Sequence, residues 1–128
     1  MIPLVSVAVG GALGASLRYL SVRWVSQAFP GFPWGTLVVN VGGSLVMGLA
    51  AVALMERFPG SWGRFAPFLM TGVLGGFTTF SAFSLDALFL VERGRMLAAL
   101  AYVAGSVGLS ILALWAGLLA GRALWGPA

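Results

Sequence analysis

The chain has 128 residues, of which 60% are hydrophobic and 8% are charged, and its mean hydropathy is +1.03. A soluble domain carries about 25% charged residues, and one of this length could not bury so much apolar surface in a small core. The net charge is +4, but the arginines are scattered singly, which argues against a nucleic-acid partner. The absence of Cys and His excludes disulfides, a Ser-His-Asp triad and the usual zinc sites. These properties predict an integral membrane protein in a lipid bilayer.

Four apolar stretches are long enough to cross the hydrocarbon core of a bilayer, which takes about 20 helical residues. They cover approximately residues 4–25, 34–55, 65–91 and 96–121, and the connections between them are too short to hold a soluble domain. Backbone groups in lipid must be hydrogen-bonded within their own segment, so we expect these spans to be helices. The sequence predicts an all-α integral membrane protein in which residues 1–128 form a single transmembrane domain.

The first stretch carries polar Ser16, Arg18 and Tyr19 within a long apolar run, and its start has no charged side chain. These features favour a transmembrane helix over a cleaved signal peptide. Arg18 lies deep in the stretch, and two interpretations of it stay open. Its side chain either snorkels to the nearby interface or adds positive potential to an anion vestibule.

The second stretch carries Thr36, Asn40 and Ser44 at steps of four, which places them on one stripe of a helix. An Asn side chain is costly in lipid and must face protein or water. It therefore predicts either a hydrogen bond to another helix or a polar path through the bundle.

The third stretch contains Gly75–Gly76 followed by several Thr and Ser residues. The glycine pair weakens a helix, and the hydroxyl groups can satisfy backbone groups that a break releases. We therefore expect a helix that is broken in the middle of the membrane, where freed carbonyl and N–H groups can bind ions. The alternative is close helix packing, because Gly72 and Gly76 form a small-xxx-small pair, and both can hold together.

Phe80 and Phe83 follow this point and share a helix face. Such residues usually face lipid or fill a core. Here they are interleaved with Thr79 and Ser81, and the positive edge of an aromatic ring can contact an anion without trapping it. Asp86 lies further along the same stretch, and we expect it to pair with an arginine of the following loop or to reach the headgroups.

The fourth stretch carries Tyr102, Ser106 and Ser110, again at steps of four. Three hydrogen-bonding groups on one stripe predict a polar track across the membrane. The alternative is that each Ser bonds back to its own helix.

Apart from Arg18, the arginines lie near the ends of the spans and are balanced between the two sides of the membrane. With four spans, one side carries Arg57, Arg64 and Arg122, and the other carries Arg23, Arg93 and Arg95. Three against three leaves the positive-inside rule without a bias. The sequence therefore predicts insertion in both orientations and an antiparallel dimer, unless another determinant fixes a single topology.

The chain resembles the CrcB/Fluc family of fluoride channels over essentially its whole length. The resemblance rests on three motifs in order, Gly10-Gly11-x-x-Gly14-Ala15-x-x-Arg18-Tyr19, Gly35-Thr36-Leu37-x-x-Asn40-x-x-Gly43 and Gly75-Gly76-Phe77-Thr78-Thr79-Phe80-Ser81-x-Phe83. One departure is Ala82, where the family often has Thr.

The resemblance implies a channel that passively exports fluoride from the cytoplasm across the cell inner membrane, through pores of an antiparallel, dual-topology homodimer. It implies a structural sodium ion, not transported, on the main-chain oxygens of Gly75 and Thr78 from each subunit, since a hard cation prefers oxygen ligands. It implies a fluoride pathway lined by Asn40, Phe80, Phe83, Tyr102, Ser106 and Ser110, with Thr36, Thr79 and Ser81 as further hydroxyl groups and Arg18 in a vestibule.

Two other functions are alternatives to the channel. A small dual-topology multidrug exporter needs a titratable carboxylate in its first helix, which this chain lacks. A membrane assembly subunit without transport would use the polar stripes for packing alone. An enzyme is least supported, because no general acid–base pair is visible, and we predict that the chain is not an enzyme.

Overall fold

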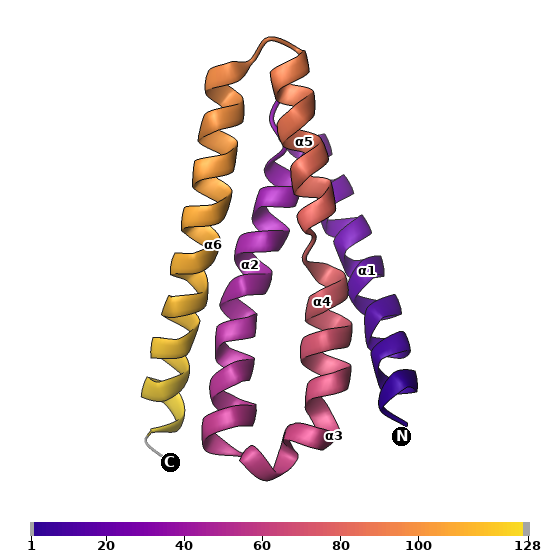
Figure 1. Ribbon diagram of the computed structural model, residues 1–128, viewed down its shortest axis with the longest axis vertical. Helices are drawn as coiled ribbons and strands as arrows, with labels where there is room; N and C mark the ends of the chain where they lie inside the picture. Colours follow the sequence, from indigo (N-terminus) through magenta and orange to yellow (C-terminus); the bar gives the residue numbers. More distant parts are fainter. Residues whose placement is uncertain (1, 127–128) are drawn as a thin grey trace.

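The computed structural model describes residues 2–126, and Figure 1 shows long helices running side by side. In chain order the elements are α1 (Pro3–Ala28), α2 (Trp34–Ala51), η1 (Val52–Arg57), η2 (Pro59–Ser61), α3 (Trp62–Ala66), η3 (Pro67–Leu74), α4 (Gly75–Phe77), α5 (Phe80–Glu92) and α6 (Met96–Trp125). Among these residues four helical spans are long and apolar enough to cross a membrane, namely Pro3–Ala28, Trp34–Arg57, Pro59–Glu92 and Met96–Trp125. The predictions of a helical fold and of four spans are confirmed.

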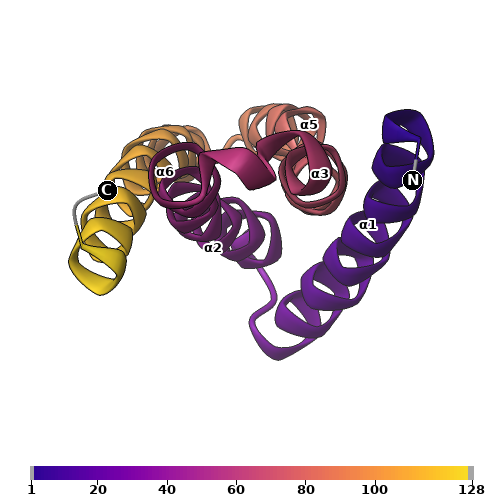
Figure 2. The ribbon, with the colours of Figure 1, turned by 90° about the horizontal axis from the view of Figure 1, so that it is seen from below.

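The spans run in alternating directions, so that the start of α1, the end of α6 and the connection between α2 and α3 lie at one end of the molecule (Figure 1). The turns between α1 and α2 and between α5 and α6 lie at the other end. Figure 2, seen from below, shows α1 and α6 at opposite edges, with α2 and the third span between them. The closest pairings are α2 along α6, and α1 along η3 and α4.

Glycine residues allow α1 to approach the third span at backbone distance. A Cβ atom on Gly72 would lie 2.9 Å from the Cα atom of Gly10, and one on Gly76 would lie 2.8 Å from the carbonyl oxygen of Gly11. Real Cβ atoms do not approach other atoms so closely. The packing interpretation of Gly72 and Gly76 is therefore confirmed.

The third span is interrupted at Thr78 and Thr79. Thr78 has φ −88° and ψ 156°, and Thr79 has φ −152° and ψ 122°, so both residues are extended between α4 and α5. Gly75 remains helical with φ −63° and ψ −37°. The sequence placed the weak point at the glycine pair, whereas the chain leaves the helix only after Phe77. Packing against α1 keeps the glycines helical, and the two threonines form the break.

Two glycine turns, one hydrogen bond and one ion pair connect the spans at the ends of the bundle. Gly31 and Gly94 have φ of 96° and 74°, a left-handed conformation that only glycine adopts without strain. The Arg95 guanidinium donates a hydrogen bond to the Gly31 carbonyl oxygen, joining the turn before α6 to the turn before α2. At the other end Arg122 and Glu56 form an ion pair of 2.7 Å, which joins α6 to η1.

Candidate functional site

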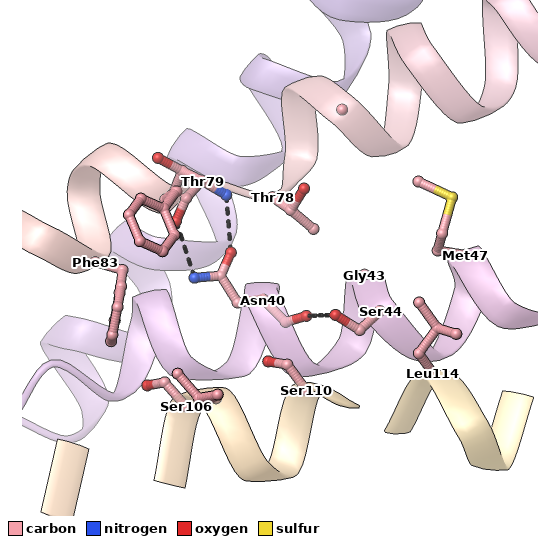
Figure 3. Close-up of a pocket in the computed structure, with 13 residues that line it drawn as sticks. Asn40, Gly43, Ser44, Met47, Thr78, Thr79, Phe83, Ser106, Ser110 and Leu114 are labelled. Atoms are coloured by element: carbon pink, nitrogen blue, oxygen red, sulfur yellow. Dashed lines mark hydrogen bonds between the residues drawn. The ribbon is translucent and has the colours of Figure 1, made fainter. Parts of the chain in front are cut away.

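A cavity of about 530 Å³ lies beside the break, between α2, the third span and α6 (Figure 3). It brings together most of the residues predicted from the sequence, which come from three different spans. Its lining includes Asn40, Gly75, Thr78, Thr79, Phe80, Phe83, Ser106 and Ser110, together with Gly43, Ser44, Met47, Val107 and Leu114. None of these lining residues carries a charge, so the site offers amide, hydroxyl and carbonyl groups in an apolar frame.

Asn40 holds the break through two hydrogen bonds to one residue. Its Nδ2 donates to the Thr79 carbonyl oxygen at 3.0 Å, and its Oδ1 accepts from the Thr79 backbone N–H at 2.8 Å, as Figure 3 shows. The interhelical hydrogen bond and the polar lining, which the sequence left as alternatives, therefore occur together. A primary amide has two N–H donors, so the second N–H of the Asn40 side chain is not used in this pairing.

The threonine hydroxyl groups at the break form hydrogen bonds with backbone groups. The Thr78 Oγ1 donates to the Leu74 carbonyl oxygen at 2.9 Å. The Thr79 Oγ1 accepts from the Ala82 N–H at 3.1 Å and thereby caps α5. Ser81 is exposed and outside the cavity lining, with its Oγ 3.3 Å from the Thr79 Oγ1.

The fourth span contributes hydroxyl groups of two kinds. The Ser106 side chain is only 5% exposed, and its Oγ has no hydrogen-bond partner, so it does not bond back to its own helix. The Tyr102 ring is buried outside the cavity lining, and its hydroxyl donates to the Asp86 carboxylate at 3.1 Å. The expected arginine partner of Asp86 was therefore wrong, because Tyr102 of the neighbouring helix supplies the donor instead.

The two phenylalanines of α5 lie in different surroundings. Their ring centroids are 5.5 Å apart with an interplanar angle of 58°. Phe83 is buried and lies 5.3 Å from the Tyr102 ring, whereas Phe80 is 77% exposed on the surface of the single chain. Phe83 is therefore part of the α5–α6 core, and Phe80 projects away from it.

A second cavity of about 370 Å³ lies between α1, α2 and α5. It holds two of the four predicted residues that the first cavity lacks, Arg18 and Thr36, and Tyr19 and Arg23 also line it. Thr79 lines both cavities. Arg18 and Ser106 therefore line different cavities, and Thr79 is the residue that the two linings share.

The residues at the break suit a hard cation in one respect. No group of three or more His, Cys, Asp or Glu side chains that could hold a metal occurs within residues 2–126, and the oxygen atoms at the break belong to main-chain carbonyl, hydroxyl and amide groups. α4 ends at Phe77, and the last carbonyl groups of a helix lack intrahelical partners and carry the negative end of its dipole. Gly75 and Thr78 both line the cavity, and their carbonyl oxygens are the donor type that sodium prefers.

Two lining residues, Ser44 and Gly43, stand in the sequence patterns described above but have no place in the predicted fluoride pathway. Ser44 was seen as part of a stripe, but its hydroxyl bonds back to the Asn40 carbonyl oxygen at 2.7 Å. Gly43 contacts the break closely, since a Cβ atom there would collide with the Thr78 side chain and would lie 3.2 Å from the Phe77 ring. The signal for Gly43 was its place three residues after Asn40, on the same side of the helix.

Residues 5–118 match the family model described as CrcB-like protein, Camphor Resistance (CrcB), and the chain belongs to this family. Similar proteins named Fluoride-specific ion channel FluC include one from Rhizobium meliloti, 55% identical over 119 residues that cover 92% of this chain and 94% of the relative. One from Cereibacter sphaeroides is 57% identical over 120 residues, covering 93% and 94%. One from Rhizobium etli is 52% identical over 125 residues, covering 97% and 99%. The family and the four spans identify a multi-pass membrane protein of a transport class, so the prediction that it is not an enzyme agrees with the comparisons.

Proposed function

We propose that this protein is the subunit of a fluoride-selective channel that lets fluoride leave the cytoplasm passively across the cell inner membrane. The names of relatives that are 52–57% identical support it. The observation that carries it is the uncharged cavity at the break, where the Ser106 hydroxyl lies buried without a partner. A buried hydroxyl without a partner costs free energy, and a passing anion would accept its hydrogen bond.

Selectivity for fluoride follows from the kind of donor in the cavity. Fluoride is small and strongly hydrated, so a pathway must replace its water, and conduction requires sites weak enough to release the ion. Ser106, Ser110 and the second N–H of Asn40 offer neutral donors. The positive ring edges of Phe80 and Phe83 add weak contacts. Lys or Arg in this position would bind the anion too firmly to release it.

The second cavity serves as a vestibule in this proposal. Arg18 raises the local anion concentration beside Thr36 and Thr79, and the ion then passes the break toward Ser106 and Ser110. Tyr102 and Ser81 lie next to this route and shape it, Tyr102 through its bond to Asp86.

The conducting unit is proposed to be a homodimer of oppositely oriented copies. Phe80 is 77% exposed beside a cavity that opens on the surface of a single chain, and a second copy would cover both. The equal arginine count on the two sides supports insertion in both directions.

A structural sodium ion at the dimer axis completes the proposal. The carbonyl oxygens of Gly75 and Thr78, supplied by each copy, would hold it, and the ion would neutralise the facing helix C-termini. Purified protein should need sodium to stay dimeric, and Gly75→Val should lose the dimer because a β-branched side chain crowds the site. Normal transport by Gly75→Val, together with indifference to sodium, would place the ion elsewhere.

The function is tested by efflux from liposomes that contain purified protein. We expect rapid fluoride release, measured with a fluoride electrode, and no chloride release under the same gradient. Equal rates for both halides would remove fluoride selectivity, and no release of either would leave a membrane protein that only assembles.

A further inference from the structure

The hydrogen bonds at the break divert two specific backbone donors. In a continuous α-helix the N–H of each residue donates to the carbonyl oxygen four residues earlier. The Thr79 N–H would then bind the Gly75 oxygen, and the Ala82 N–H would bind the Thr78 oxygen. These two oxygens are the ones assigned to sodium above.

Neither donor reaches its helical acceptor in this structure. The Thr79 N–H is bound by Asn40 Oδ1 at 2.8 Å, and the Ala82 N–H is bound by Thr79 Oγ1 at 3.1 Å. The Asn40 Nδ2 also donates to the Thr79 carbonyl oxygen at 3.0 Å, so Asn40 is hydrogen-bonded to both polar backbone groups of the extended residue. Two side chains thus keep the oxygens of Gly75 and Thr78 without their helical donors.

We infer, on the basis of the sodium site proposed above, that Asn40 and Thr79 are positioning residues for that site. Asn40 is not a ligand of the cation. It holds the Thr79 N–H away from the Gly75 oxygen, and the Thr79 hydroxyl does the same for the Thr78 oxygen. Asn40 also lines the cavity beside the break, which is the proposed fluoride path. One side chain therefore couples the shape of the cation site to that of the fluoride path.

The two roles of Asn40 can be separated by substitution. Asn40→Ala removes both contacts to Thr79, so the helix can close and cover the Gly75 oxygen. Asn40→Asp keeps an acceptor for the Thr79 N–H but brings a negative charge to the anion path. The positioning role therefore predicts that sodium dependence is lost in Asn40→Ala and kept in Asn40→Asp, while fluoride flux falls in both.

The measurement is a sodium titration of thermal stability. Each protein is purified without sodium, with N-methylglucamine as the replacement cation, and the sodium concentration for half-maximal stabilisation is determined. We expect Asn40→Ala to raise this concentration at least tenfold, and Asn40→Asp to leave it within threefold of wild type. Ser84→Ala is the control, because its hydroxyl bonds within α5 to the Phe80 carbonyl oxygen at 3.0 Å, and it should match wild type.

Thr79 provides an independent pair if Asn40→Ala does not fold. Thr79→Val keeps the β-branched shape but removes the acceptor for the Ala82 N–H, and it should raise the half-maximal sodium concentration by at least tenfold. Thr79→Ser keeps the acceptor and should keep the half-maximal sodium concentration of wild type. An unchanged sodium response in Asn40→Ala or Thr79→Val, or its loss in Asn40→Asp, overturns the positioning role.

Failure of this inference is distinguishable from failure of the channel proposal. A wild-type protein whose stability ignores sodium overturns both the cation site and the role of Asn40, even if liposomes release fluoride. A protein that responds to sodium as described but releases no fluoride leaves the positioning role standing and refutes the channel.

Discussion

The Ser106 hydroxyl is a buried polar group that packing alone does not explain. Its side chain is 5% exposed and its Oγ is unpartnered, although most buried polar atoms in folded proteins are hydrogen-bonded. Ser44, in the same cavity, bonds back to its own helix. The fourth span thus keeps a donor free at a site where a simple structural serine would not.

Replacing Ser106 with Ala is expected to stabilise the protein and to slow the channel. The substitution removes a buried unsatisfied group, which costs about 1–3 kcal/mol when left in place. On the proposed pathway it also removes a donor to the passing anion, and a loss of about 1.4 kcal/mol corresponds to a tenfold lower rate. Fluoride efflux per folded dimer and thermal stability should therefore move in opposite directions, with Ser84→Ala as the reference. Unchanged efflux would remove Ser106 from the path.

Phe80→Ile and Phe83→Ile are expected to differ in stability. Phe83 is buried against Tyr102, so its loss should lower the free energy of unfolding by about 1–3 kcal/mol. Phe80 is 77% exposed, so Phe80→Ile should leave the single subunit stable while reducing fluoride flux by about tenfold. Equal destabilisation in a urea titration of the detergent-solubilised protein would contradict the division between the two rings.

At the scale of elements, the third span combines two kinds of sequence that act at different positions. Gly72 and Gly76 lie against α1, and the helix continues through them because the close backbone contact stabilises it. The extended residues come later, where Asn40 of α2 binds Thr79. Packing therefore determines where this helix remains intact, and a hydrogen bond from another helix determines where it ends.

The two adjacent glycines should respond differently to the same methyl group. A Cβ atom on Gly76 would lie 2.8 Å from the Gly11 oxygen, whereas the nearest atom to one on Gly75 is the Met70 oxygen at 3.6 Å. We expect Gly76→Ala to destabilise the subunit by about 1–3 kcal/mol through overpacking, and Gly75→Ala to fold normally. The yield of folded protein on size-exclusion chromatography measures this, and equal yields would show that α1 shifts freely.

The sequence predicted the elements better than the contacts between them. Hydropathy was enough for the four spans, because lipid imposes a length and a composition on each. The partner of Asn40 lies 39 residues away, and neither hydropathy nor helical spacing identifies it. The three-residue spacing of Phe80 and Phe83 predicted a shared face, but it could not show that one ring is buried by Tyr102 and the other is not. Spacing describes one helix, whereas burial depends on its neighbours.

At the scale of the molecule, both ends are tied by arginines in different ways. One end has the Arg95 bond to the Gly31 carbonyl oxygen, and the other has the Arg122–Glu56 ion pair at 2.7 Å. The pair is about half exposed, with side-chain exposures of 49% and 43%, so water screens the attraction and the pair contributes little to stability. Arg95 and Arg122 belong to opposite sides, so each side still has three arginines.

Adding positive charge to one end should therefore bias insertion. Gly60 lies in the connection between α2 and α3, with open space at its Cβ position and no positive φ. Gly60→Lys should therefore keep this connection in the cytoplasm. Because the wild-type chain has no Cys, single Cys labels in the same loop report its side in intact cells. We expect labelling from both sides in wild type and from one side in Gly60→Lys.

Function provides the second half of this test. A population with one orientation lacks antiparallel partners, so Gly60→Lys alone should lose fluoride resistance in cells. Coexpression with Glu92→Lys, which adds charge at the opposite end, should restore it. Wild-type labelling from one side only would contradict dual insertion.

The balance of arginines also affects how such a dimer can be controlled from outside. In an antiparallel homodimer each loop is present in both compartments, one copy on each side, so the assembly has no surface that belongs to the cytoplasm alone. A blocker applied from one side would meet the same binding surface that the other side presents. A kinase or protease confined to one compartment would reach one of the two copies of any loop. Every inherited substitution would likewise be tested in two chemical environments at once, which restricts the loops to residues that tolerate both.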